Sequence, residues 1–322
     1  MTDPAKLSDE LEQEGAAFDT RIRERMAHGH IPDLRRAAPT DWFNNNVWRR
    51  PLFVNMLNQR VISFCVTNLE AGSRVLEVGC GPGHMSLELA RNGFHVTGLD
   101  VAGETLDVAR KLAEENPYRQ SWGGVDYVRA DFLDWRPGSG EAFDAICFFG
   151  ALHHFPDAGQ VLDRTLELLQ RNGRMIAYEP ARDWWLDTDA SLLILVRLLL
   201  SGTGAWYQDL PQLTSADDLD RMIEATLAEI RNAHPAGEPA QSPRDNSAYG
   251  TEMLAAIRER FDEIGFAPAT VMFDRVVGGI RLQPEESVAR LAHTLELFEL
   301  RAIEAGLMRP AGFMFAGRAR GD

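Results

Sequence analysis

Glycine and acidic residues stand directly after two apolar segments, where they could hold a ligand. Gly79, Gly81 and Gly83 follow residues 75–78, and Asp100 ends the next apolar segment. Glycines let the backbone turn tightly and let a ligand approach with no Cβ in the way. The free N–H groups at the start of the following helix suit a carboxylate or a phosphate, and Asp100 is placed to accept hydrogen bonds from ribose hydroxyls. These residues predict a nucleoside-binding site.

Titratable side chains that could move a proton follow later apolar segments. His153 and His154 come just after residues 143–149, and histidine is the side chain whose unperturbed pKa lies near neutrality. Either could act as a base or orient a substrate, and we favour His154; the alternative is that they pack structurally. Glu179 and Asp183 are secondary candidates, better suited to structural or substrate-orienting roles. Since two adjacent histidines cannot easily face one site from a strand, no metal site is predicted.

The spacing of apolar residues predicts the elements that position these side chains. Between residues 74 and 179, short apolar runs alternate with segments of helical periodicity, and repeated βα units of this length form a parallel, doubly wound sheet. Strands are expected at residues 75–78, 95–99, 125–130, 143–149 and 174–178. Helical stripes are expected at residues 85–90, 106–113 and 161–169. The predicted fold class is therefore α/β, a Rossmann-like sheet with helices on both faces.

After residue 180 the regular alternation breaks. Helices are expected at residues 184–200 and 217–230, and the polar, proline-containing stretch 232–246 predicts a loop. A helix at 251–264, a strand at 270–277, a helix at 284–305 and a last strand at 312–317 would follow. We therefore expect four segments. They are a helical lead-in or lid at 1–60, the cofactor-binding core at 61–180, a helical insertion that caps the substrate at 181–248, and the C-terminal completion of the sheet at 249–322.

The glycine segment has the pattern E-x-G-x-G-x-G, from Glu77 to Gly83. A dinucleotide fingerprint would need a small residue at position 84, where this sequence has His84. The segment resembles motif I of the class I S-adenosylmethionine-dependent methyltransferases. The resemblance continues in order through four further landmarks. These are residues 98–100, 129–132, 143–146 leading into 151–155, and 172–174.

The resemblance implies that the last two strands, at 270–277 and 312–317, form an antiparallel pair at the end of the sheet. It also implies S-adenosyl-L-methionine as the cofactor and a role for each matching residue. Glu77, Gly79, Cys80, Gly81 and Gly83 would surround its methionine part. The ribose and adenine would be held by Asp100, Val101, Asp131 and Phe132, while Phe149 and Gly150 would face the sulfonium side. The glycines could instead form a generic tight turn, Asp131 could be a surface turn residue, and Glu77 could be a structural cap of the loop.

The acceptor is less constrained by the sequence. Two aromatic pairs in the insertion, Trp184 with Trp185 and Trp206 with Tyr207, could line an acceptor pocket or pack between helices or across a homodimer interface. A lead-in cluster with Trp42 and Trp48 could form a lid or anchor the segment, and Arg35, Arg36, Arg49 and Arg50 could meet an anionic substrate or solvent. We expect methylation of a small-molecule hydroxyl, of a sugar or secondary metabolite. The alternatives are a nicotinamide-dependent dehydrogenase and a non-catalytic partner protein.

Composition agrees with a small-molecule enzyme. Lys and Arg number 33 against 48 Asp and Glu, a net charge of −15, which argues against nucleic acid or an anionic membrane as the partner. Three cysteines form no paired framework, the N-terminus lacks the features of a signal peptide, and the apolar run 192–200 is too short to span a bilayer. A cytoplasmic protein is expected, with a homodimer possible.

Overall fold

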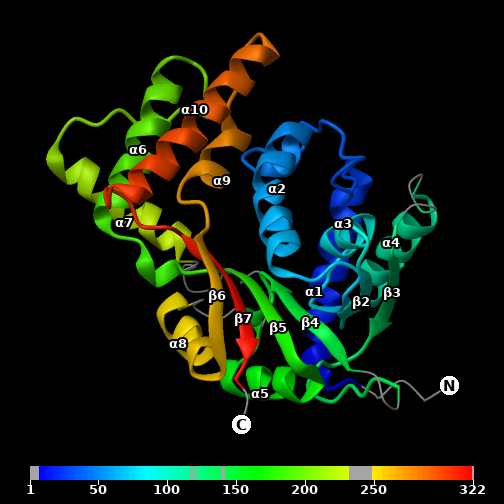
Figure 1. The fold of residues 1–322 in the computed structure, drawn as a ribbon. Coiled ribbons are helices and arrows are strands. Elements are labelled where there is room, and N and C mark those ends of the chain that lie inside the picture. Colours follow the sequence, from blue (N-terminus) through cyan, green and yellow to red (C-terminus); the bar gives the residue numbers. More distant parts are fainter. Residues whose placement is uncertain (1–6, 117–118, 120–121, 139–141, 232–248, 321–322) are drawn as a thin grey trace.

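Seven strands form one sheet in a computed structural model, which describes residues 7–116, 119, 122–138, 142–231 and 249–320. The order is β3-β2-β1-β4-β5-β7-β6, in which β1 to β5 run parallel and β7 runs antiparallel to both of its neighbours (Figure 1). The strands are β1 (Arg74–Val78), β2 (His95–Asp100), β3 (Gly124–Arg129), β4 (Phe143–Phe149), β5 (Leu169–Pro180), β6 (Phe261–Pro268) and β7 (Gly312–Ala319). The mostly parallel, doubly wound α/β sheet predicted from the sequence is confirmed.

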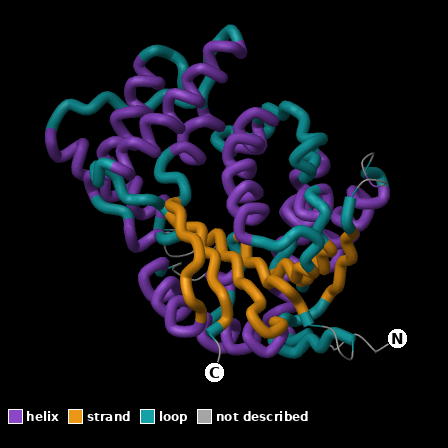
Figure 2. Tube along the Cα trace, in the orientation of Figure 1, coloured by secondary structure: helices purple, strands orange, loops and turns teal. Residues whose placement is uncertain are grey.

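Helices cover both faces of this sheet (Figures 1 and 2). On one face α2 (Pro51–Asn68) and α3 (His84–Arg91) bury their apolar side chains, and on the other face α5 (Ala158–Leu168) and α8 (Gly250–Arg260) do so. Near the β3 edge lies α4 (Gly103–Glu114). Parallel strands covered on both faces are apolar along most of their length, which is why β1 and β4 could be recognised in the sequence.

The strand predicted at residues 270–277 is wrong. The strand that precedes β7 in the chain is β6, and residues 270–277 instead contain the short helix α9 (Phe273–Val276) and the start of the 3₁₀ helix η5 (Val277–Gly279). The helix predicted at 251–264 ends as α8 at Arg260. The strand β6 lies at the edge of the sheet and its residues 262–264 are exposed, so the sequence there lacks the apolar run that marks a buried strand. Residues 271–277 do contain such apolar residues, but these are buried among the helices of the cap.

A helical cap stands on the edge of the sheet where the parallel strands end. It consists of α6 (Asp187–Gly202), α7 (Ala216–Ile230), α9 and α10 (Glu285–Glu304), which share a core of their own. The chain enters the cap after Pro180 of β5, returns to the sheet to form α8 and β6, and then re-enters the cap before β7 begins at Gly312. Pro180 and Gly312 are paired. Trp185 and Trp206 are buried in the cap core, so these two aromatic residues pack between helices.

The lead-in is attached to α3 by a buried ionic network. The Arg91 guanidinium donates to both carboxylate oxygens of Asp33 at 2.6 and 2.8 Å, and both side chains are almost completely buried. Arg35 pairs with Glu88 of the same helix, and the Trp48 ring meets His84 edge-on at 5.5 Å. These contacts anchor residues 33–48 of the lead-in to α3.

The four arginines singled out in the sequence, Arg35, Arg36, Arg49 and Arg50, have carboxylate partners. Besides the Arg35 pair, Arg36 lies 3.4 Å from Glu115, and Arg49 lies 2.9 Å from Asp41. Arg50 contacts both Asp41 and Glu285. The local basic charge is therefore used within the chain.

Replacing Asp33 tests the anchor. Removing one partner of a buried ion pair leaves the other charge unpaired, so Asp33→Ala should lower the free energy of unfolding by about 3 kcal/mol or more. Arg36→Ala, which removes a partly exposed pair on the same segment, should cost less than about 1 kcal/mol. Urea denaturation of the three proteins measures both values. Equal losses in the two variants would contradict the account of the anchor.

A buried carboxylate holds the cap helices together. Glu299 of α10 accepts hydrogen bonds from the backbone N–H of Met272 and Phe273 at 2.6 and 2.8 Å, at the start of α9. Its side chain is fully buried, and burial raises its pKa to about 7, against the lowering effect of those hydrogen bonds. Ionised Glu299 therefore weakens the fold at high pH.

This gives a pH-dependent prediction for Glu299→Gln. Between the unfolded pKa near 4.5 and the folded value near 7, the folded state holds a proton that the unfolded state has lost, so wild-type stability falls as pH rises through this window. The neutral amide removes this loss, so the variant should be about 1–3 kcal/mol more stable than wild type at pH 8 and nearly equal at pH 4. Denaturant unfolding at both pH values measures the difference. A variant with no gain at pH 8 would disprove the pKa assignment, and Glu304→Gln, exposed on the same helix, is the control.

Candidate active site

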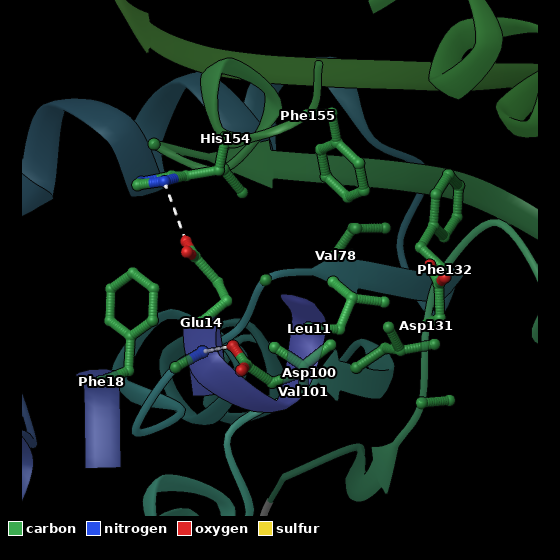
Figure 3. A pocket seen from close by; sticks show the side chains of 16 residues that line it. Leu11, Glu14, Phe18, Val78, Asp100, Val101, Asp131, Phe132, His154 and Phe155 are labelled. Atoms are coloured by element: carbon green, nitrogen blue, oxygen red, sulfur yellow. Dashed lines mark hydrogen bonds and ion pairs between the residues drawn. The ribbon is translucent and has the colours of Figure 1, made fainter. Parts of the chain in front are cut away.

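A pocket of about 180 Å³ opens at the ends of β1, β2, β3 and β4. The helix α1 (Asp9–Ala27) lies across it and contributes three of its lining residues (Figure 3). The complete lining is Leu11, Glu14, Phe18, Val78, Gly79, Gly81, Leu99, Asp100, Val101, Ala130, Asp131, Phe132, Gly150, Ala151, His154 and Phe155. Carboxyl ends of neighbouring parallel strands meet at one edge, and this pocket is at the point where the strand order reverses between β1 and β4.

The glycine loop forms the floor of the pocket. Gly79 and Gly81 both have positive φ, at 69° and 52°, a region that side chains disfavour. A Cβ on Gly79 would lie 2.7 Å from the Cβ of Ala151, whereas a Cβ on Gly81 would meet no atom within 4 Å. The first glycine therefore permits close packing of the loop, and the second leaves its backbone open toward the pocket.

Asp100 fixes the shape of the loop as well as facing the pocket. Its Oδ2 accepts from the Gly81 N–H at 2.8 Å, and its Oδ1 accepts from the Ala102 N–H at 2.9 Å. Burial raises the pKa of this carboxyl group, against the lowering effect of the backbone hydrogen bonds. Asp131 lies just beyond the end of the neighbouring strand β3, where its Oδ1 accepts from the Leu133 N–H at 3.0 Å. A carboxylate has about four acceptor positions, so both side chains can accept further hydrogen bonds.

The two histidines face different surroundings. His154 lines the pocket, with its Nδ1 3.5 Å from Oε1 of Glu14. His153 is absent from the lining, and its Nδ1 is 2.8 Å from Oε2 of Glu179. The other oxygen of Glu179 accepts from the backbone N–H of Ala151 and Leu152 at 2.9 and 2.8 Å. Glu179 thus organises the turn that presents His154.

Eight of the thirteen residues predicted for the site line the pocket, and five do not. The five are Glu77, Cys80, Gly83, Phe149 and His153. Glu77 lies beneath the loop, where it accepts a short hydrogen bond from Ser86 and burial raises its pKa to about 8. The thiol of Cys80 points toward Gly98, where a Cβ would come within 2.9 Å of its sulfur. Gly83 is the left-handed N-cap of α3.

The structure also gives the positions of two further residues considered in the sequence, Asp183 and Phe132. Asp183, a secondary candidate, accepts from Gly250 and Thr251 at the start of α8 and is therefore a cap of that helix. Phe132 is buried, with its ring edge-on to Phe148 at 5.9 Å. Among the described residues, no group of three metal-ligating side chains is found.

The lining residues of α1 were missed in the sequence. Leu11, Gly15, Phe18 and Ile22 follow the spacing of one helical face, and Glu14 lies beside that stripe. In the sequence, the one sign that this helix could contribute to a site was a carboxylate, Glu14, beside its apolar face. It could not show which surface the helix covers, because that depends on packing between segments distant in the chain.

Comparison with known proteins identifies the core. Residues 75–173 match the family model described as "Methyltransferase domain". A "Ubiquinone biosynthesis O-methyltransferase" of Xylella fastidiosa (strain 9a5c) is 39% identical over 161 residues, which is 50% of this chain and 62% of that protein. A relative of the same name from Alkalilimnicola ehrlichii is 29% identical over 211 residues, covering 65% of this chain and 77% of that protein. The chain thus spans less than two thirds of the length of the Xylella relative.

Solved structures share the whole fold at low sequence identity. The [4+2]-cyclase SpnF is 15% identical with a TM-score of 0.51, covering 99% of this chain and 100% of that chain. A geranyl diphosphate C-methyltransferase of Streptomyces coelicolor A3(2) is 14% identical with a TM-score of 0.51, covering 99% and 100%. The described residues include no helix long and apolar enough to cross a membrane. Residues 75–173 are therefore a methyltransferase domain, in agreement with the resemblance of their motifs to the class I S-adenosylmethionine-dependent methyltransferases.

Proposed function

We propose that this chain transfers the methyl group of S-adenosylmethionine to a hydroxyl oxygen of a small molecule. The observation that carries the proposal is the pocket itself, which combines an open glycine backbone, two carboxylates and a histidine at one edge of the sheet. The names of the relatives, ubiquinone biosynthesis O-methyltransferases, support oxygen as the methylated atom. Because a [4+2]-cyclase has the same fold, the reaction needs an argument from the site.

The residues of the pocket fit the cofactor. Gly81 leaves open space beside its backbone, as close approach of a ligand requires. Asp100 would accept from the ribose hydroxyls and Asp131 from the adenine amino group, with the apolar residues Val101 and Phe132 beside the ring. Gly79, Gly81 and Gly150 would border the methionine part and the sulfonium. Glu77 would act from below, by holding the loop through Ser86.

The chain contributes positioning and a base. S-adenosylmethionine supplies a methyl group on a positively charged sulfur. Positioning the acceptor against such a methyl group accounts for most of the rate that a methyltransferase provides. An aliphatic hydroxyl must also lose a proton, and His154 is the pocket residue suited to take it. His153 supports it by fixing the turn through Glu179.

The cap gives the basis for the acceptor class. It rises from the same edge of the sheet as the pocket and lies outside the matched family domain, so it would carry the specificity of this chain. Helices at that edge favour an enclosed small molecule over a macromolecule. We therefore propose a sugar or a secondary metabolite as the acceptor.

Titration of the purified protein tests cofactor use. Asp100→Ala should weaken binding of S-adenosylhomocysteine by about 1–3 kcal/mol, or roughly 5- to 150-fold, since it removes hydrogen bonds to a charged acceptor. Asp126→Ala, which changes an exposed carboxylate of β3, should bind as wild type does. Calorimetry with S-adenosylmethionine, S-adenosylhomocysteine and NAD measures the affinities. Binding of NAD in place of the other two would refute the proposal.

Substitution of His154 tests the base. With an acceptor found by screening sugars and phenolic metabolites, His154→Ala should lower kcat about 10²- to 10⁴-fold and leave cofactor affinity nearly unchanged. A matched control is His293→Ala, because that side chain is exposed on α10. Methylated product is measured by mass spectrometry. Unchanged turnover in His154→Ala would remove His154 from the mechanism.

A further inference from the structure

Helix α1 is fastened to the loops that form the pocket. Asp19 Oδ1 accepts from the backbone N–H and the hydroxyl of Thr105, at 2.8 and 2.9 Å, beyond the end of β2. Glu12 pairs with Arg129 at the end of β3 at 2.8 Å. Together with the contact to His154 after β4, one helix thus touches the chain beyond three strands of the site.

Gly15 brings the helix close enough for its side chains to enter the pocket. A Cβ at this position would lie 3.0 Å from the carbonyl oxygen of Val101, which is closer than nearly all real contacts of that kind. The backbone of α1 therefore lies directly on the turn after β2. In this position Glu14 and Phe18 point toward His154 (Figure 3).

The His154 ring is held by two side chains from α1. Phe18 meets it edge-on, with ring centres 5.7 Å apart, and Oε1 of Glu14 lies 3.5 Å from its Nδ1. Glu14 is only 4% exposed, and a buried carboxylate is costly unless it is paired. Among the lining residues, His154 is the one side chain that can carry positive charge. A small movement of either side chain would shorten this contact to a hydrogen bond.

We propose that Glu14 is a positioning residue for His154. It accepts a hydrogen bond from Nδ1–H, which keeps Nε2 free of a proton and able to act as a base. This inference rests on the proposed function for its catalytic consequence. It means that the N-terminal helix, outside the matched domain, completes the site.

The proton and the charge balance in the following way. As the O–H bond of the acceptor breaks, its proton goes to Nε2 of His154, and the electron pair of the oxygen forms the new O–C bond. The electron pair of the S–C bond stays on sulfur. One positive charge thus moves from sulfur to the imidazole ring, where the buried carboxylate of Glu14 stabilises it.

His153 provides an internal reference. Its Nδ1 is already paired with Glu179 at 2.8 Å, so its neutral form should carry the proton on Nδ1 whatever occupies position 14. The same tautomer at His154 should depend on Glu14. This difference separates the proposed role from a general loosening of the pocket.

The tautomer of His154 is the direct test. Long-range ¹H–¹⁵N spectra of ¹⁵N-histidine protein are recorded at alkaline pH with S-adenosylhomocysteine, and the signal is assigned with His154→Gln. Wild type should show proton-bearing Nδ1, Glu14→Leu should show proton-bearing Nε2, and Glu14→Gln should keep the wild-type form because its amide oxygen can still accept. Glu12→Gln, on the same helix, should match wild type. A proton on Nε2 in wild type, or no change in Glu14→Leu, overturns the inference.

Kinetics give a second readout. With the screened acceptor, Glu14→Leu should lower kcat about 100-fold, with KM and cofactor affinity within about threefold of wild type. An intermediate loss is expected for Glu14→Gln, which keeps the hydrogen bond and loses the charge. A rise in KM alone would overturn the inference. Wild type that binds no S-adenosylhomocysteine would instead refute the proposed function, whatever tautomer His154 has.

Discussion

The reversal of strand order between β1 and β4 is the constraint on which the site depends. Connections from neighbouring strands leave in opposite directions at this point, so a crevice opens between them. The glycine loop leaves from β1, and the turn with His154 leaves from β4. The hydrogen bonds of Asp100 and Glu179 then fix these two connections. Each carboxylate therefore holds in place a backbone segment that borders the pocket.

Buried charge organises the surroundings of this crevice. Arg91 and Asp33 attach the lead-in to α3, Glu299 joins α10 to α9, and Glu14 connects α1 to His154. In each case a buried carboxyl group meets donors from a segment distant in the sequence. Such pairs add little net stability compared with apolar packing, but breaking one leaves a buried charge without its partner. They are suited to fixing how segments are arranged around the sheet.

The parallel half of the fold could be predicted from the sequence because its strands are short, apolar and regularly spaced. Positions after these strands could be predicted for the same reason, and Asp100, Asp131 and His154 do line the pocket. It could not be predicted that Glu77 and Cys80 point away from the pocket, because spacing along the chain does not show which side of a loop a residue faces. The edge strand β6 was mistaken because its exposed acidic residues do not alternate with apolar ones. The covering role of α1 depends on the close approach at Gly15, which is a tertiary contact.

The most direct test of the account is a crystal structure of the protein with S-adenosylhomocysteine. The account predicts the ligand in the pocket between Asp100 and Asp131, with α1 over it and Glu14 still beside His154. A ligand bound elsewhere, or a pocket that remains filled by α1 at saturating ligand, would contradict it.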